Sequence, residues 1–301
     1  MRHKSLLPWL CLAYMGLSWG LSFSMAKLAA DTGAHPFVIA FWQTSLSSLI
    51  LFGICHIRGR KFSITRHSIP TYLALALLGS AIPGVAFYYS AAKVPAGVLS
   101  LTVSLIPALT YAIALAIKSE TLEARRLLGL MLGFSAICLV ILPDTSLPTK
   151  GMTFWVLLAC FSSLSYASEN IFLAERPLDD IGPLRLSCGM NLFAALLLLP
   201  LAGSIGEINA PFEGTAVLPL SILGLSLISV TAYTLFIFSV RQFGAIFASQ
   251  VGYVVTLCGL LWGIVLFNEV HSPWIWSAFV VMMIGLFFVK PRSDQIEDQK
   301  S

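Results

Sequence analysis

Charged side chains are scarce in this 301-residue chain. Aspartate, glutamate, lysine and arginine make up 11% of its residues, whereas soluble domains carry about 25%. Apolar residues make up 57%, and the mean hydropathy is +0.87. A soluble fold of this length has no interior large enough to hide so much apolar surface, but a lipid bilayer accepts it. The composition therefore predicts an integral membrane protein and excludes a soluble domain.

The sequence also lacks the patterns of several functional classes. Its six cysteines form no CxxC pair and lie within apolar stretches, which indicates packing rather than redox chemistry. No two of the five histidines have the spacing of metal ligands, so we expect no metal and no cofactor. A P-loop is absent, which argues against an ATP-driven pump. The net charge of +4 is spread over short gaps between apolar stretches, a pattern that does not favour nucleic-acid binding.

Apolar stretches as long as a membrane-spanning helix, about 20 residues, recur along the chain. The first follows Arg2-His3-Lys4, and we interpret it as an uncleaved helix because it is longer than the core of a signal peptide. We therefore expect an all-α integral membrane protein with ten transmembrane helices. The predicted spans are 8–30, 36–57, 69–92, 95–117, 125–143, 151–174, 182–203, 216–239, 244–267 and 272–289.

Lysine and arginine predict the orientation, because these residues concentrate in cytoplasmic loops. With ten helices and a cytoplasmic N-terminus, 15 of the 18 basic residues fall on the cytoplasmic side. The other three are Lys27, Lys93 and Lys150. This asymmetry predicts that the N- and C-termini are both cytoplasmic. Residues 291–301 are polar, and we expect them to form a cytoplasmic tail.

The two halves of the chain resemble each other. The matched pairs are Ser90 with Ser239, Ala96 with Ala245, Ser100 with Ser249 and Glu120 with Glu269 at a shift of 149 positions, and Trp19 with Tyr166 and Pro36 with Pro183 at a shift of 147. Each half then holds five helices, an odd number, so the halves cross the membrane with opposite polarity. This arrangement is an inverted repeat, which is common in transporters. We place the first repeat at 1–145 and the second at 146–290.

Three stretches resemble a known family. They are Trp19–Phe23, Tyr89–Glu120 and its counterpart Phe238–Glu269. Through them the chain resembles the drug/metabolite transporter superfamily, specifically the EamA-type ten-helix bacterial exporters. The resemblance implies a central cavity lined by helices one to four and six to nine, with helices five and ten outside it. It also implies efflux of small metabolites such as amino acids across a bacterial inner membrane by alternating access, often driven by protons.

Glu169 is the most informative polar residue, because ionisable groups inside a membrane are costly. It follows a serine-rich run at 162–168, deep in the predicted helix 151–174, with Asn170 beside it. One interpretation is a proton acceptor or a partner for the ammonium group of a substrate. The other is that Glu169, one to two turns from the cytoplasmic end of its helix, simply reaches water.

Other polar and aromatic residues at membrane depth are candidates for the cavity wall, because each must find a partner or face water. Lys27 could bind a carboxylate, or extend to the outer surface beside Asp31. For the hydroxyl and aromatic residues, packing and interhelical hydrogen bonds are the alternative. The candidate substrate-binding residues are Trp19, Ser22, Phe23, Lys27, Gln43, Tyr88, Tyr89, Glu169, Asn170, Tyr233 and Gln250.

Two further patterns suggest structural roles. Glu120 and Glu269 end the fourth and ninth predicted helices, where they could cap a helix or pair with Arg125 and His271. Glycines four residues apart let helices approach closely. The pair in the fifth helix could support either packing or a homodimer. These glycine pairs are Gly16 with Gly20, Gly129 with Gly133, and Gly259 with Gly263.

The function that we predict is secondary transport, namely export of small metabolites such as amino acids. Aromatic residues together with Glu169 and Lys27 favour an amino acid or amine as the substrate, and protons are a candidate coupling ion. We predict no enzymatic activity, because paired carboxylates or a nucleophile with its base are missing from the spans. The alternatives are an importer, a multidrug or amine efflux carrier of the same fold, and a membrane protein that transports nothing.

Overall fold

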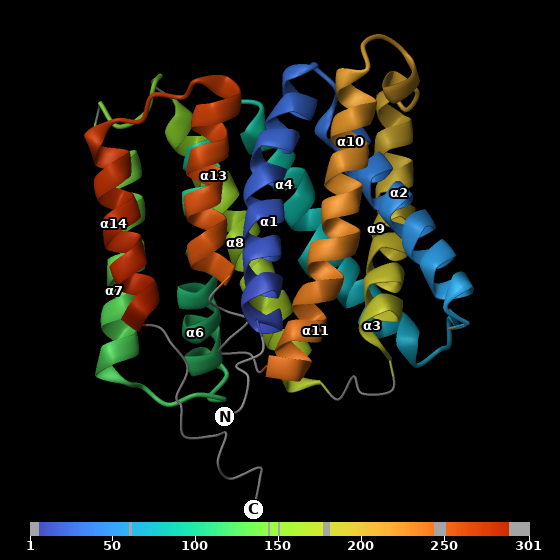
Figure 1. The fold of residues 1–301 in the computed structure, drawn as a ribbon, viewed down its shortest axis with the longest axis horizontal. Coiled ribbons are helices and arrows are strands. Elements are labelled where there is room, and N and C mark those ends of the chain that lie inside the picture. Colours follow the sequence, from blue (N-terminus) through green and yellow to red (C-terminus); the bar gives the residue numbers. More distant parts are fainter. Residues whose placement is uncertain are drawn as a thin grey trace, which may run out of the picture.

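The computed structural model describes residues 6–59, 62–143, 145–149, 151–176, 181–243 and 251–288. Within these ranges the chain is helical and contains no β-strand. The helices lie roughly side by side, with their ends at two opposite faces of the molecule (Figure 1). We call the upper end the face at which α13 (Val251–Phe267) connects to α14 (Pro273–Phe288), and the lower end the opposite face.

The first half of the chain passes back and forth between these two ends. Its helices are α1 (Leu7–Asp31), α2 (Pro36–Ile57), α3 (Ser68–Ala76), α4 (Ile82–Ala91), α5 (Ala96–Val103), α6 (Ile106–Ala116) and α7 (Ala124–Ile141). A π-helical turn, η1 (Leu77–Ala81), joins α3 to α4. A short break separates α5 from α6. The third and fourth helical spans of this half, Ser68–Ala91 and Ala96–Ala116, are therefore both interrupted.

The second half repeats this pattern. Its helices are α8 (Met152–Glu175), α9 (Pro183–Ile205), the short 3₁₀ turn η2 (Ala210–Phe212), α10 (Val217–Ile228), α11 (Thr234–Phe243), and then α13 and α14. A second π-helical turn, η3 (Ser229–Tyr233), joins α10 to α11. Each half thus carries a π-helical turn in its third helical span.

Eight helical segments are long and apolar enough to cross a membrane. They are Leu7–Asp31, Pro36–Ile57, Ser68–Ala91, Ala96–Ala116, Ala124–Ile141, Met152–Glu175, Pro183–Ile205 and Val217–Ser239, and they coincide with the first eight predicted spans. The ninth and tenth coincide with shorter apolar helices, α13 and α14. Residues 244–250 and 289–290 lie outside the described residues. A multi-pass membrane protein is confirmed, while the count of ten remains a prediction.

The exterior of the bundle suits lipid. Large apolar side chains such as Trp9, Phe134, Leu196 and Val265 are exposed. The residues buried between the helices include many alanines, serines and glycines, which let the backbones approach closely. Exposed apolar surface on this scale is unfavourable in water and favourable in the hydrocarbon core of a bilayer.

The glycine pairs form contacts within the chain. A Cβ atom on Gly20 would lie 2.6 Å from Cβ of Cys258, so α1 packs against α13 with no space between them. A Cβ atom on Gly285 would lie 3.1 Å from the carbonyl oxygen of Gly129 and 3.3 Å from the amide nitrogen of Gly133. The glycine pair of the fifth helix therefore packs α7 against α14.

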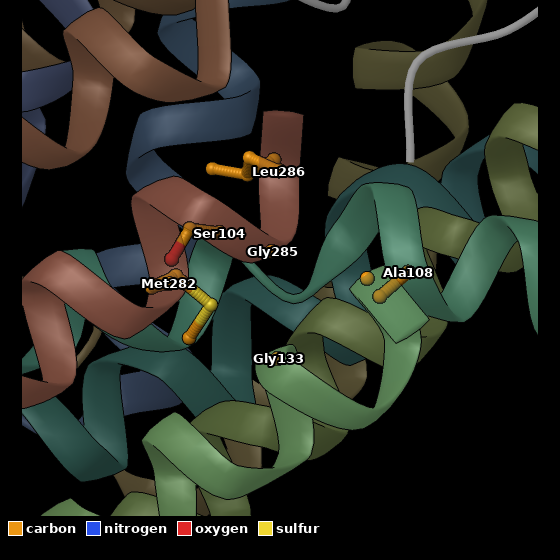
Figure 2. Close-up of a pocket in the computed structure, with 7 residues that line it drawn as sticks. Ser104, Ala108, Gly133, Met282, Gly285 and Leu286 are labelled. Atoms are coloured by element: carbon orange, nitrogen blue, oxygen red, sulfur yellow. The ribbon is translucent and has the colours of Figure 1, made fainter. Parts of the chain in front are cut away.

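α7 and α14 lie together at one side of the bundle (Figure 1), as the resemblance implies for helices five and ten. Figure 2 shows the crevice between them, lined by residues of α6, α7 and α14 and by Ser104. The crevice has no room for a water molecule, and its walls are almost entirely apolar. This crevice is therefore a packing seam, and we look for the substrate site elsewhere.

The partner of Glu120 differs from our prediction. The Oε2 atom of Glu120 accepts a hydrogen bond from Nη1 of Arg126 at 3.0 Å. Arg125 instead lies over the ring of Phe287, with its guanidinium carbon 5.4 Å from the ring centroid. One residue along a helix changes direction by about 100°, so Arg126 faces the end of α6 and Arg125 faces α14.

Candidate functional site

Glu169 is buried in the lower half of α8. Its exposed fraction is 3%, so it does not reach water, and one of our two interpretations is wrong. Its Oε1 atom accepts a hydrogen bond of 2.6 Å from the hydroxyl of Tyr233. In the described part of the chain, no lysine, arginine or histidine forms an ion pair with Glu169. The carboxyl group therefore has a hydrogen-bond donor but no resident cation.

Gly79 makes room for this carboxyl group. A Cβ atom at position 79 would overlap the Glu169 carboxyl carbon and both of its oxygens. Any larger residue at this position would displace the Glu169 carboxyl group from η1. We call Gly79, Glu169 and Tyr233 the Glu169 junction.

Both π-helical turns meet at the Glu169 junction. Gly79 belongs to η1 in the first half, and Tyr233 is the last residue of η3 in the second half. Single π-helical turns are rare and frequently mark functional sites. The junction thus brings the π-helical turn of each half next to the same buried carboxyl group.

Pro83 explains part of this irregularity. The amide of Ile82 donates to the carbonyl oxygen of Leu77, five residues earlier. The next such bond would run from residue 83 to Leu78, but proline has no N–H group. The hydroxyl of Ser165 donates to this carbonyl oxygen instead, at 2.8 Å.

Two neighbouring serines of α8 act in the same way. Ser162 donates to the carbonyl oxygen of Pro83, and Ser163 donates to that of Thr102, each at 2.9 Å. Thr102 lies at the end of α5, just before the break that precedes Pro107. In lipid, backbone groups freed by a break must find another partner. α8 therefore supports the interrupted spans of the first half with hydroxyls and presents Glu169 one to two turns below.

The aromatic residues of α1 lie near this region. The ring centroids of Trp19 and Phe236 are 5.6 Å apart, and Phe236 is one turn beyond Tyr233. The ring of Phe23 packs on Phe87 at 5.5 Å. The hydroxyl of Ser22 donates to the carbonyl oxygen of Trp19 at 2.7 Å. Trp19 and Phe23 are therefore packed against aromatic residues of α11 and α4, and the Ser22 hydroxyl is engaged by its own helix.

Two other candidates lie at the upper end, away from Glu169. Nζ of Lys27 is 3.1 Å from Oδ1 of Asp31 and 5.7 Å from the ring centroid of Phe267. The hydroxyl of Tyr89 is 3.2 Å from Nε2 of His35, the residue that caps α2. Lys27 therefore already has an anionic partner, and Tyr89 joins α4 to the N-terminus of α2.

The remaining candidates are spread over several helices. Nε2 of Gln43 lies 3.5 Å from the hydroxyl of Ser47 on the same helix. Tyr88 is buried beside Phe87, and Asn170 is half-buried next to Glu169 in α8. Gln250 lies outside the described residues. The structure thus brings Glu169 and Tyr233 into contact and places Trp19 one aromatic ring away from that helix turn, but it does not gather all eleven candidates.

Sequence reasoning missed Gly79 and the role of the serines. Gly79 lies four residues before Pro83, which is the carbonyl position that proline leaves unpaired in an α-helix. This spacing is the signal that could have drawn attention to it. The run Ser162, Ser163 and Ser165 was visible in the sequence, but its partners lie in another half of the chain.

The chemistry available at the Glu169 junction is that of a buried acid with one hydrogen-bond donor and aromatic neighbours. Such a group can hold a proton, or it can pair with a cation brought in by a substrate. Among the described residues there is no group of three His, Cys, Asp or Glu side chains that could hold a metal ion.

Three curated relatives from Arabidopsis thaliana match part of the chain. The WAT1-related proteins At1g11460, At1g01070 and At1g11450 are each 26% identical to it, over 121, 118 and 118 residues. The matched part is 40%, 38% and 38% of this chain, and 36%, 32% and 34% of the relatives. The chain thus covers about a third of the length of these relatives.

A solved structure shares the fold over the full length. It is described only as "Crystal structure of protein", and it superposes with a TM-score of 0.60 at 14% identity, covering 99% of this chain and 100% of the other. The sequence profile of the EamA-like transporter family matches residues 6–142 and again 153–290. These two matches include almost all of the described helices. The chain belongs to the EamA-like transporter family.

Proposed function

We propose that this protein is a secondary transporter that exports small amino-bearing metabolites, amino acids or related compounds, by alternating access. The Glu169 junction carries the proposal. A buried carboxylate without a resident cation is costly, and the cost is relieved when a proton or a substrate ammonium group joins it. A site that alternates between these two partners exchanges a proton for a substrate.

The position of the junction supports alternating access. Glu169 lies on α8 in the second half, and Gly79 lies on η1 in the first half. The repeat in the sequence and the paired π-helical turns support two halves of inverted topology. In transporters of that kind, the substrate site lies at the interface between the repeats.

The charges around the site favour a cation over a carboxylate as the recognised group. Trp19, packed on Phe236 one turn beyond Tyr233, provides aromatic surface near the junction, which suits an ammonium group or a flat side chain. Lys27, the candidate partner for a carboxylate, is 3.1 Å from Asp31 at the upper end. This observation supports the amine efflux carrier as a second candidate beside the amino-acid exporter.

Orientation follows from the loops. The loops at the lower end contain Arg58, Arg66, Lys118 and Arg176. Positive residues concentrate on the cytoplasmic side, so we assign the lower end to the cytoplasm and the upper end to the exterior. A bacterial inner membrane is the location that we propose. These four basic residues and the polar tail at 291–301 support cytoplasmic termini.

Uptake into proteoliposomes tests the function. We expect saturable uptake of a labelled amino acid or amine, and we expect an imposed pH gradient to change its rate. Glu169→Gln should lower the rate at least about tenfold and remove the response to the gradient, because the amide cannot bind a proton or pair with an ammonium group. Tyr233→Phe, which removes only the hydrogen-bond donor, should have a smaller effect.

Glu175→Gln is the matched control. Glu175 ends the same helix and is exposed, so its loss should leave transport unchanged. If Glu169→Gln retains the full response to the pH gradient, proton coupling through Glu169 is wrong. If the folded protein takes up none of the amino acids and amines tested, the substrate class is wrong.

A further inference from the structure

Glu269 joins the two halves at the upper end of the molecule. It lies in the loop between α13 and α14, and its side chain is 9% exposed. Its Oε1 atom accepts a hydrogen bond from the amide of Ala96 at 2.7 Å, and Oε2 accepts one from the amide of Gly97 at 3.0 Å. Ala96 and Gly97 are the first two residues of α5. A carboxylate from the second half thus caps a helix of the first half.

α5 depends on this distant cap. The first N–H groups of a helix have no partner within the helix and usually receive one from the N-cap side chain. The N-cap residue of α5 is Pro95, which provides no side-chain hydrogen bond. The positive end of the helix dipole also favours an anion at this point. Glu269 supplies both the acceptors and the charge.

Two glycines form a seat for the carboxylate. A Cβ atom on Gly263 would overlap Oε2 of Glu269 and would lie 3.1 Å from the amide nitrogen of Gly97. A Cβ atom on Gly97 would lie 2.6 Å from Nε2 of His271 and 3.1 Å from Oε2 of Glu269. Any larger residue at either position would push the carboxylate away from α5.

The contact between α5 and α13 continues below the cap. The hydroxyl of Ser100 donates to the carbonyl oxygen of Thr256 at 3.2 Å, which links α5 to α13 one turn further down. A Cβ atom on Gly259 would overlap the side chain of Ser100. At this level the two helices are in direct contact. Opening of the upper end between these two helices separates α5 from α13 and breaks the bonds to Glu269.

We propose that Glu269 is the latch of the upper end, a carboxylate that holds α5 when this end is closed and releases Ala96 and Gly97 when it opens. The proposal rests on the proposed function, because only a transporter needs the two halves to part. Release is feasible because Glu269 is held by backbone amides. Nε2 of His271 also lies 3.6 Å from Oε2, while among the described residues no lysine or arginine pairs with Glu269. Water can replace these hydrogen bonds when α5 and α13 separate.

Cysteine labelling tests the latch without any substrate. Ser100→Cys, in a background without the six native cysteines, places a buried reporter on α5 beneath the cap. Val270→Cys, at a position that is 93% exposed in the upper loop, marks the side from which reagent reaches the upper end. A membrane-impermeant maleimide is added to each side of the reconstituted protein, and the labelling rate is measured.

We expect Glu269→Ala to raise the labelling rate of Ser100→Cys at least about fivefold from the Val270 side, since opening no longer breaks the cap. Glu269→Gln should give a smaller increase, because the amide retains one acceptor oxygen. Glu120→Ala, the equivalent change in the first half, should leave the rate unchanged. Only variants with a cooperative thermal transition are compared, and Glu269→Gln supplies the test if the alanine variant does not fold.

Equal labelling rates in all folded variants would show that Glu269 is a fixed cap and would overturn the proposal. An increase from the opposite side would also overturn it, because the latch would then control the lower end. Neither outcome depends on which solute is carried. The latch can therefore fail while transport through Glu169 is upheld, and the reverse is equally visible.

Discussion

Glu269 and Glu120 occupy equivalent positions in the two halves, 149 residues apart in the sequence, yet their surroundings differ. The side chain of Glu269 is 9% exposed and caps α5. The side chain of Glu120 is 42% exposed and pairs with Arg126, a buried arginine that also lies 3.4 Å from Glu123. One end of the molecule thus uses the repeated glutamate to join the halves, and the other uses it to neutralise an arginine.

Small residues account for this difference. The shift of 149 positions that superimposes Glu120 on Glu269 also superimposes Ala114 on Gly263 and Ile246 on Gly97. The seat of Glu269 needs glycine at both positions. The equivalent positions hold a methyl group in the first half, at Ala114, and a branched side chain in the second half, at Ile246, which lies outside the described residues. Equivalent residues in a repeat therefore acquire different roles when the residues that make space for them change.

The largest effect is expected from filling the seat. Gly263→Ala should destabilise the protein by about 2 kcal/mol, because its Cβ atom would overlap the Glu269 carboxylate in a packed region. Helix propensity alone predicts the opposite sign, since alanine is favoured over glycine by about 1 kcal/mol. Thermal unfolding in detergent measures the sign directly.

Ala114→Gly is the matched change in the first half. It should cost about 1 kcal/mol, the ordinary difference in helix propensity. If Gly263→Ala is more stable than the native protein, the seat does not constrain Glu269 and the comparison between the two ends fails.

A smaller effect is expected from the two glutamates themselves. Glu269→Gln should cost about 1 to 2 kcal/mol, because its NH₂ group would face one of the two amides and leave that buried donor unpaired. Glu120→Gln should cost about 0.5 kcal/mol, because the pair is exposed on the glutamate side and Glu123 remains beside Arg126. Unfolding curves of the two variants, recorded under the same conditions, measure the loss of stability in each. Equal losses would contradict the contrast.

The smallest effect concerns pH. Burial lowers the pKa of His271, and the nearby carboxylate of Glu269 partly opposes this change. A lowered pKa in the folded state means that the unfolded chain binds the proton first. This contribution to stability is therefore complete above the ordinary histidine pKa of about 6.5 and decreases as the pH falls below it. Melting temperatures of the native protein and His271→Asn between pH 8 and 5.5 should diverge at the acid end. Parallel curves would contradict a buried neutral histidine.

Much of the fold could be predicted because membrane insertion depends on summed hydropathy over about 20 residues. Such a sum tolerates errors in single positions, and the first eight predicted spans coincide with helices. Proline alone does not predict the interruptions, since Pro83 and Pro107 lie beside them while Pro200 lies within the continuous helix α9. The spans, by contrast, depend on local sequence alone.

The partners of individual side chains could not be predicted. Glu169 was identified from its cost in a membrane, but its contact with Tyr233 joins residues 64 positions apart, and its approach to Gly79 depends on how the halves dock. Glu269 was a candidate for capping a helix or pairing with His271, which lies 3.6 Å away, yet the sequence does not say that the capped helix is α5 in the other half. The choice of Arg126 over Arg125 depends on the rotation of α7, which a hydropathy pattern does not define when both neighbours are basic.

The π-helical turns have a consequence for how this protein can change over evolutionary time. A π-helical turn arises when one residue is inserted into an α-helix, so a single deletion within Leu77–Ala81 would return that helical span to regular form. The deletion would also rotate every residue beyond it by about 100°, and Gly79 would no longer face the carboxyl group. A lineage that repaired its helix in this way would gain a more regular backbone and lose the close contact between the first half and Glu169.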